Sequence, residues 1–299
     1  MATTPGAKPQ VKNPNEGVQQ TAPPPFRISR PTAQERYLKL LIYGTFGSGK
    51  TTLGASACNI DSMKDVLLVS AESGELSVED YDLFAVDVKN YSTLGKVYEF
   101  LRQHCKARDA DDVDKLKELE SRVTGEVPEE PLRFRTVIID SLTEVEAYCM
   151  NQLLGVTDST KIDEEVQSAE WAEYKKNNSM ITRLIRSFRD LPMHVIMVAS
   201  EQYTQDETKK FKYSPNLTGK LSKGVQGFFD MVGYLAVGNA DEKGNVSRRL
   251  YVQPSGQGKY DAKHRYAKFK GTYFDIPSTP SAGQSTALGG ILKQTGLSS

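Results

Sequence analysis

The residues best suited to chemistry form a glycine-rich segment that ends in a lysine and two threonines. In order, they are Gly44, Thr45, Phe46, Gly47, Ser48, Gly49, Lys50, Thr51 and Thr52. Glycines let the backbone curl so that successive N–H groups point at phosphate oxygens, and the start of a following helix adds partial positive charge. At this spacing, Lys50 reaches the β and γ phosphates and the Thr51 hydroxyl ligates Mg²⁺. The segment therefore predicts a site for a nucleoside triphosphate.

A carboxylate that could complete the Mg²⁺ site lies at the end of another apolar run. Asp140 directly follows residues 137–139, which are Val, Ile and Ile. An unpaired carboxylate at the end of a buried strand is costly to desolvate, so a metal ion is a natural partner. We therefore expect Asp140 and Thr51 to hold Mg²⁺. The alternative is that Asp140 only caps the helix that starts at Ser141.

Hydrolysis of a nucleotide also requires a group that orients or deprotonates water. Glu72 follows the apolar run 66–70. This places it at the carboxyl end of a strand, where open α/β sheets bind their ligands. Glu144, four residues after Asp140, is the competing candidate. We favour Glu72 as the water-activating residue.

Alternating strands and helices must position these side chains. Apolar runs rich in Val, Leu and Ile indicate strands buried on both faces at 37–43, 66–70, 134–140 and 194–200. Helical stretches separate them at about 50–59, 92–104, 141–154 and 169–190. This alternation predicts an α/β fold with a mostly parallel central sheet flanked by helices. Two later runs, 231–238 and 248–253, predict a C-terminal antiparallel hairpin extension.

The two ends of the chain have a different composition. Residues 1–33 are rich in proline and predict a disordered arm, because such a segment buries too little apolar surface to offset its ordering entropy. Residues 34–276 form the predicted domain. Residues 277–299 are rich in Ser, Thr and Gly and predict a flexible tail. An apolar patch within that tail, 288–297, is an alternative docking peptide for a partner.

Composition excludes several classes of protein. The chain has 299 residues, with 38 Lys plus Arg and 38 Asp plus Glu, which argues against a general binder of polyanions. No apolar run approaches the length that crosses a bilayer, and the first 30 residues contain no segment of signal-peptide type. The three cysteines lie far apart, which argues against a disulfide framework or a cysteine zinc site. We expect a cytoplasmic protein that does not contact a membrane.

At the phosphate-binding segment and the Asp140 strand, the sequence resembles the RecA-like P-loop ATPases. More narrowly, it resembles the bacteriophage nucleotide-binding proteins of the single-strand annealing type, over residues 35–272 as an order of elements. The resemblance implies that Glu72 activates water and that Gln202 senses the γ-phosphate, with Ser200 as the alternative sensor. The neighbouring Glu201 departs from the family pattern.

The resemblance also implies a basic motif near the end of the domain, which Lys263 and Arg265 match. Two basic residues at this spacing in a strand point to one face and can approach one phosphate together. In the family, this motif often reaches the γ-phosphate of a neighbouring subunit. A site completed in this way implies a homo-oligomer. The alternative is an ordinary basic edge strand.

The segment after Gln202 combines basic and aromatic residues: Lys209, Lys210, Phe211, Lys212 and Tyr213. Basic groups follow a phosphate backbone while aromatic faces stack on bases, as binding of single strands without sequence preference requires. In the RecA relatives, the loop at this position contacts single-stranded DNA. The same alternation of residues also fits a half-buried hairpin with lysines outward.

Together these features predict an ATP- and Mg²⁺-dependent ATPase that binds single-stranded DNA. The resemblance implies a role in annealing or recombination during phage DNA metabolism, in an infected or lysogenic bacterial cell. The alternative is an ATPase that acts on protein partners, as a helicase loader does. In either case the terminal tails could bind a single-strand-binding protein or a replication partner. A small-molecule kinase is disfavoured because no arginine-rich lid segment is visible.

Overall fold

The computed structural model describes residues 37–297 except 73, 158, 206–208, 243, 245, 268 and 277–286. The proline-rich arm expected at 1–33 lies outside these described residues. The domain expected at 34–276 overlaps a compact unit that spans Arg36–Ser299. Among the described residues, no helix combines the length and apolar character needed to cross a membrane.

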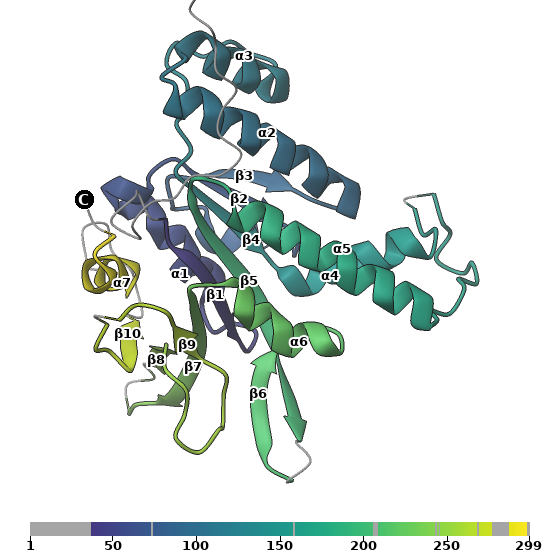
Figure 1. Ribbon diagram of the computed structural model, residues 1–299, viewed down its shortest axis with the longest axis vertical. Coiled ribbons are helices and arrows are strands. Elements are labelled where there is room, and N and C mark those ends of the chain that lie inside the picture. The colour runs from purple at the N-terminus through teal and green to yellow at the C-terminus, as the bar shows by residue number, and fades with distance from the viewer. Residues whose placement is uncertain are drawn as a thin grey trace, which may run out of the picture. The chain divides into compact units, whose positions relative to one another are not determined.

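A mixed sheet with the strand order β10-β8-β7-β1-β5-β4-β2-β3 forms the centre of this unit (Figure 1). Its parallel part comprises β1 (Lys39–Gly44), β2 (Val66–Ser70), β3 (Phe84–Asp87), β4 (Thr136–Asp140), β5 (His194–Gln205) and β7 (Met231–Ala240). The antiparallel part adds β8 (Val246–Tyr251), β10 (Tyr273–Ile276), β9 (Lys263–His264) and β6 (Phe211–Pro215). The predicted parallel sheet with an antiparallel extension is therefore confirmed.

Helices pack on both faces of the sheet. They are α1 (Lys50–Ala55), α2 (Tyr91–Asp109), α3 (Val113–Thr124), α4 (Leu142–Leu153), α5 (Trp171–Arg189), α6 (Lys220–Gly224) and α7 (Ala287–Thr295). Short 3₁₀ turns occupy Ser56–Asn59, Asp61–Met63, Glu75–Val78 and Val225–Phe228. Strand β1 is buried along its whole length, and its alternate residues enter two different cores. Leu41 and Tyr43 pack with α2, α4 and α5, whereas Leu40 and Ile42 pack with α1 and α7.

Helix α7 differs from the flexible tail expected at 277–299. Its residues Leu288, Ile291 and Leu292 are buried in the same core as Leu40 and Ile42. Apolar residues at these spacings form one stripe along a helix, and burying that stripe against the sheet stabilises the helix. Residues 277–286 and 298–299 of the expected tail lie outside the described part of the chain.

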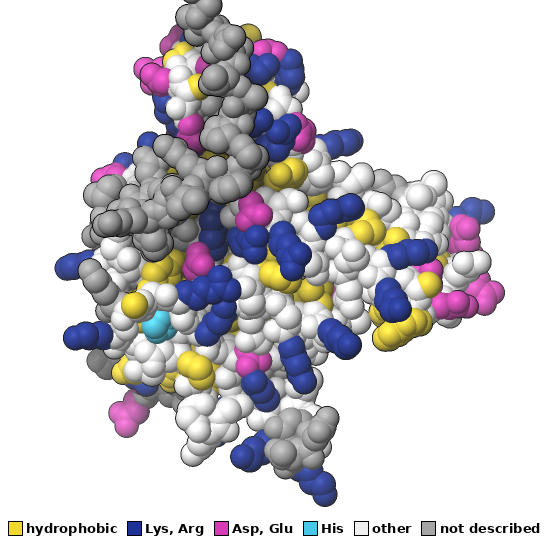
Figure 2. All heavy atoms as spheres, viewed as in Figure 1, with side chains coloured by type: hydrophobic (Ala, Val, Ile, Leu, Met, Phe, Trp, Pro, Cys, Tyr) yellow, Lys and Arg dark blue, Asp and Glu magenta, His cyan; other side chains and the backbone are white. Residues whose placement is uncertain are grey.

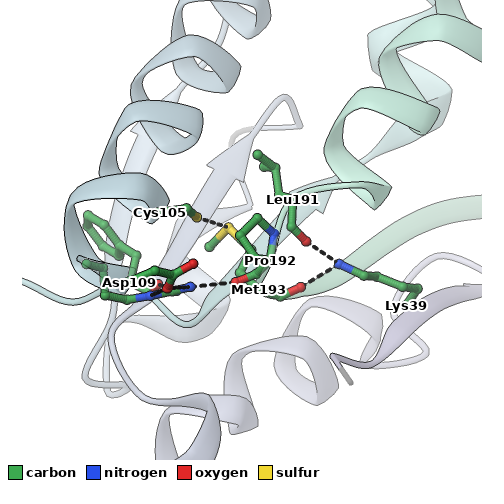
Figure 3. Close-up of polar contacts among 8 residues, drawn as sticks. Lys39, Cys105, Asp109, Leu191, Pro192 and Met193 are labelled. Carbon is green, nitrogen blue, oxygen red and sulfur yellow. Dashed lines mark hydrogen bonds and ion pairs between the residues drawn. The ribbon is translucent and has the colours of Figure 1, made fainter. Parts of the chain in front are cut away.

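The turn between α5 and β5 is held by two cations from other elements (Figure 3). The Lys39 ammonium donates hydrogen bonds to the carbonyl oxygens of Leu191 and Met193, at 2.7 and 2.6 Å. Arg108, on α2, donates to the carbonyl oxygen of Pro192 at 2.6 Å and pairs with Asp109. Burial lowers the pKa of Lys39 to about 7. These contacts fix the start of β5 beside the start of β1, at the sheet edge far from the glycine-rich loop.

Candidate nucleotide-binding site

The glycine-rich loop joins the end of β1 to the start of α1, as the sequence predicts. Gly44 pairs with Leu235 of β7, and a Cβ added at Gly44 would lie 2.4 Å from the Leu235 carbonyl oxygen. Gly47 and Gly49 have φ angles of 70° and 93°, a left-handed backbone conformation that favours glycine. Each of these three glycines is therefore required by close packing or by the turn of the loop.

Lys50 folds back over this loop. Its ammonium group is buried and donates to the carbonyl oxygens of Gly44 and Thr45, at 3.1 and 2.8 Å. Burial lowers the pKa of Lys50, and the nearby carboxylates of Asp140 and Glu72 partly offset that effect. The structure thus places the predicted phosphate-binding lysine at the concave side of the loop.

Thr51 and Asp140 meet as expected for a metal site. The Thr51 hydroxyl hydrogen-bonds to Oδ2 of Asp140, and Oδ1 of Asp140 is buried without a hydrogen-bond partner in the described structure. Burial, together with the Glu72 charge, raises the pKa of Asp140 to about 6. The described residues include no cluster of three or more His, Cys, Asp or Glu that could hold a metal alone. A hydroxyl and one carboxylate fit Mg²⁺, which usually completes its shell with water and substrate phosphates.

Glu72 and its competitor Glu144 occupy different positions around Ser141. The Glu72 carboxylate accepts a hydrogen bond from the Ser141 hydroxyl and lines the cavity beside the loop. Glu144 contributes only its backbone N–H to that hydroxyl, at 3.4 Å, and its side chain does not line the cavity. The geometry favours Glu72 as the residue that contacts water.

The cavity next to the loop has a volume of about 350 Å³. Pockets of this size are typical small-molecule sites. Its wall comes from the loop and α1, from Glu72 and Ser77, and from the C-terminal elements through Arg248, Ile276 and Ala287. Ala287, which belongs to the tail expected to be flexible, therefore lies in the wall of the nucleotide cavity together with Arg248 and Ile276.

Gln202 does not face the loop. Its side-chain amide donates to the Pro215 carbonyl oxygen at 2.9 Å and to the Ser222 hydroxyl at 2.7 Å, on the side of β6 and α6. Because successive strand residues point to opposite faces, Glu201 takes the other side. The Glu201 carboxylate interacts with Lys50 and accepts a hydrogen bond from the Tyr234 hydroxyl. The alternative sensor, Ser200, is buried beside Gly44.

Lys263 and Arg265 also lie away from the loop of their own chain. Lys263 pairs with Val232 at the start of β7, and the preceding residue Met231 pairs with Leu40 of β1. Leu40 and Gly44 are four residues apart, which corresponds to about 13 Å along a strand. Arg265 lies 3.6 Å from Asp230 at the same edge. These two residues could reach a phosphate only in another subunit.

Arg248 is a charged residue of the cavity that the sequence does not reveal as a site residue. It lies on β8, and its Nε is 3.7 Å from the position that a Cβ of Gly49 would occupy. The hairpin strand was predicted, but the sequence contains no signal for which strand would border the loop. That information comes only from the pairing of β8 with β7 and of β7 with β1.

The predicted DNA-binding residues lie on β6 and just before it, in the hairpin of β5 and β6, which extends beyond the sheet (Figure 1). The rings of Tyr203 and Phe211 stack at 4.8 Å with an angle of 9°, and their side chains are 55% and 51% exposed. Lys212 pairs with Asp261, whereas Lys209 is exposed. Lys and Arg side chains gather around the end of this hairpin, at the bottom of the view in Figure 2. The segment does form a hairpin. This finding is compatible with both interpretations of the sequence pattern, a DNA-binding surface and a half-buried hairpin with lysines outward.

The loop after β1, with Asp140 at the end of β4 two strands away in the sheet, defines a P-loop nucleotide-binding domain. A family model described as an AAA domain matches residues 36–266, and the chain belongs to this family. Among curated protein sequences, none matched the chain.

Several solved structures are similar over most of the chain. A KaiC-like protein from Pyrococcus horikoshii is 12% identical, with 76% of this chain and 85% of that chain covered and a TM-score of 0.39. The flagellar accessory protein FlaH from Methanocaldococcus jannaschii is 11% identical, with 83% and 89% covered and a TM-score of 0.37. The RadB recombinase is 14% identical, with 81% and 90% covered and a TM-score of 0.38. The family assignment rests on the sequence match alone.

Proposed function

We propose that the protein is a Mg²⁺-dependent, RecA-like ATPase that binds single-stranded DNA and promotes annealing or recombination in phage DNA metabolism. The observation that carries the ATPase proposal is the convergence of Lys50, Thr51 and Glu72 on one cavity, with Asp140 hydrogen-bonded to Thr51. These are a phosphate-binding cation, a metal-binding pair and a base, which are the groups that phosphoryl transfer to water needs.

Each residue has a distinct role in this proposal. The loop N–H groups and Lys50 bind the phosphates, and Thr51 and Asp140 hold Mg²⁺. The bound Mg²⁺ supplies charge that offsets the negative phosphates. Glu72 orients the attacking water and accepts its proton, while the Ser141 hydroxyl holds the Glu72 carboxylate in place.

A row of aromatic rings supports the DNA part of the proposal. Four tyrosines stand opposite one another on the adjacent strands β1, β7, β8 and β10: Tyr43, Tyr234, Tyr251 and Tyr273. From Tyr234 the row continues into the hairpin through Tyr213, at 5.5 Å between ring centroids, to Tyr203 at 4.7 Å. The exposed rings of Tyr203 and Phe211 form its end. These two exposed rings are a stacking surface for bases, and nearby lysines attract the phosphates.

Two contacts connect this row to the nucleotide cavity. Glu201 interacts with Lys50 and accepts a hydrogen bond from Tyr234. The buried Tyr43, one residue before the loop, donates to the Asp261 carbonyl oxygen at 2.6 Å and accepts from the Asp261 N–H at 2.8 Å. Asp261 in turn pairs with Lys212 of the hairpin. A change at the loop can therefore reach the hairpin through a short chain of contacts.

The experiment that tests this function is ATP hydrolysis by the purified protein with and without single-stranded DNA. Lys50→Ala is the inactive control, because it lacks the proposed phosphate-binding lysine. We expect strong stimulation by single strands, little by duplex, and loss of the stimulation in Phe211→Ala. Trp171→Ala is the matched control, because Trp171 is an aromatic residue 72% exposed on α5, outside the hairpin.

Two other results would each contradict one part of the proposal. Hydrolysis that ignores DNA, with no retention of the protein on a single-stranded DNA column at low salt, would contradict the DNA part of the proposal. An ATPase that acts on protein partners would then be the better assignment. Absence of hydrolysis in both wild type and Lys50→Ala would contradict the ATPase part.

A further inference from the structure

Strand β8 places two adjacent arginines on opposite sides of the sheet extension. Arg249 faces away from the cavity, where it pairs with Asp275 at 2.9 Å and lies over the Tyr273 ring at 4.7 Å. Arg248 lines the cavity beside the loop. The two arginines are neighbours on the same strand. Of the two, only Arg248 lacks an acidic partner among the ion pairs of the described residues.

The guanidinium of Arg248 is close to the loop and incompletely satisfied. Its Nε and Cδ lie 3.7 and 3.8 Å from the Cβ position at Gly49. Nε is buried and has no hydrogen-bond partner within the described part of the chain. A buried N–H of a charged group without an acceptor costs free energy that a bound ligand can recover.

The other polar groups of the cavity do not supply that acceptor. Glu72, the carboxylate that lines the cavity, already accepts from Ser141. The other cation of the cavity, Lys50, is engaged with the carbonyl oxygens of Gly44 and Thr45. What fits next to Arg248 is therefore an anion with several oxygens, because the planar fork of a guanidinium binds phosphate through parallel hydrogen bonds.

We propose that Arg248 binds the phosphate chain of a nucleotide held by the loop of its own chain. This inference rests on the proposed nucleotide-binding function and adds to it the residue that supplies the second cation in cis. Lys263 and Arg265 cannot do so, since they lie at the amino ends of the parallel strands, away from the loop. A single subunit therefore contains both cations needed to bind the nucleotide, and the strand β8 contacts the nucleotide directly.

The test is calorimetric titration of the full chain with Mg²⁺ and a non-hydrolysable ATP analogue, and separately with Mg²⁺ and ADP. Arg248→Met keeps the length of the apolar stem but removes the charge, and Arg249→Met is the matched control. We expect Arg248→Met to weaken binding of both nucleotides roughly 10- to 100-fold, the range of a lost hydrogen bond to a charged group. Arg249→Met should stay within about twofold of wild type. Affinity unchanged in Arg248→Met would overturn the proposal.

The same titrations distinguish a failure of this inference from a failure of the proposed function. If neither wild type nor Arg249→Met binds nucleotide, the function itself is contradicted. If Arg248→Met melts at a lower temperature than wild type without nucleotide, the comparison moves to Arg248→Lys, which keeps the charge but not the fork. Binding weakened roughly threefold or more in Arg248→Lys supports the contact, and wild-type affinity overturns it.

Discussion

At the scale of single residues, carboxylates surround the one lysine of the loop. Asp140, Glu72 and Glu201 each favour the charged form of Lys50, while its burial disfavours that form. The pKa of Asp140 and that of Glu201 are both raised by burial. So many carboxylates near a phosphate site repel the ligand unless a metal ion offsets them. This balance supports the proposed roles of Mg²⁺ and of the cationic side chains in the cavity.

The role of Glu72 gives the first prediction. Glu72→Gln should lower the hydrolysis rate by about 10²- to 10⁴-fold, the usual contribution of a general base, and leave nucleotide affinity nearly unchanged. Glu144→Gln should hydrolyse ATP at close to the wild-type rate, because its side chain does not line the cavity. Single-turnover hydrolysis and nucleotide titration check the two variants. The opposite ranking would assign the base to Glu144.

A buried histidine gives a prediction on pH. Nδ1 of His194 accepts the backbone N–H of Leu38 at 3.0 Å, and burial lowers the pKa of His194 to about 4. The unfolded chain binds a proton near pH 6.5 and the folded chain only near pH 4, so His194 destabilises the fold progressively as the pH falls from 6.5 to 4. We expect a loss of roughly 2 kcal/mol in the free energy of unfolding between pH 6.5 and 4.5.

Urea unfolding at those two pH values measures this effect. The comparison is with His194→Gln, which has no titrating group at this position. The loss on acidification should be smaller in His194→Gln than in wild type. Equal losses in the two proteins would show that other groups cause the acid sensitivity.

Site residues were predictable from the sequence where their spacing along the chain determines their position. The loop, Lys50 and Thr51 belong to one short segment, and Asp140 and Glu72 end strands that the apolar runs reveal. Gln202 was placed wrongly because a one-residue difference along a strand reverses the direction of the side chain. Arg248 was missed because its neighbours in space come from distant parts of the chain.

At the scale of elements, the strands buried on both faces were predictable and the helix α7 was not. Runs such as 137–139 contain only Val and Ile, which indicates a central strand whatever the rest of the fold does. Helix α7 contains two adjacent glycines, 289 and 290, which disfavour a helix by local propensity. Burial of Leu288, Ile291 and Leu292 against the sheet overcomes that preference, and the sequence does not show this surface in advance.

Helix α7 gives the third prediction. Leu288→Ala should lower the free energy of unfolding by about 2–5 kcal/mol, because it leaves a cavity in place of a fully buried side chain. It should also weaken nucleotide binding, because the adjacent Ala287 lines the cavity. Lys293→Ala, at an exposed position of the same helix, should change neither quantity. Denaturant unfolding and nucleotide titration test both effects.

At the scale of the whole molecule, the two cationic groups proposed for the phosphate lie at opposite edges of the sheet. The loop with Arg248 lies at the edge formed by the carboxyl ends of the parallel strands, and Lys263 with Arg265 at the edge formed by their amino ends. We propose that the latter pair acts on the phosphate of a neighbouring subunit in a homo-oligomer. One subunit would then present its loop to the Lys263 edge of the next.

Mixing two inactive variants tests this arrangement. Arg265→Ala should bind nucleotide like wild type but hydrolyse it roughly 10³-fold more slowly or worse, as loss of an arginine in trans does in related chemistry. Lys50→Ala should be inactive because its loop cannot hold phosphate. A mixture of the two should recover hydrolysis, because some sites combine an intact loop with an intact Arg265. No recovery, at concentrations where wild type is oligomeric, would contradict action in trans.

The row of tyrosines has an optical consequence. The ring of Tyr260 lies between those of Tyr234 and Tyr251, at 5.1 and 5.0 Å between centroids. With Tyr260 included, neighbouring ring centroids of the row are 4.7 to 5.7 Å apart, close enough for excitation energy to migrate from ring to ring before emission. The chain has one tryptophan, Trp171. Without tryptophan emission, as in Trp171→Ala, the tyrosine fluorescence of the chain would include the emission of the whole row. A base that stacks on Phe211 or Tyr203 would then quench far more light than one isolated ring emits.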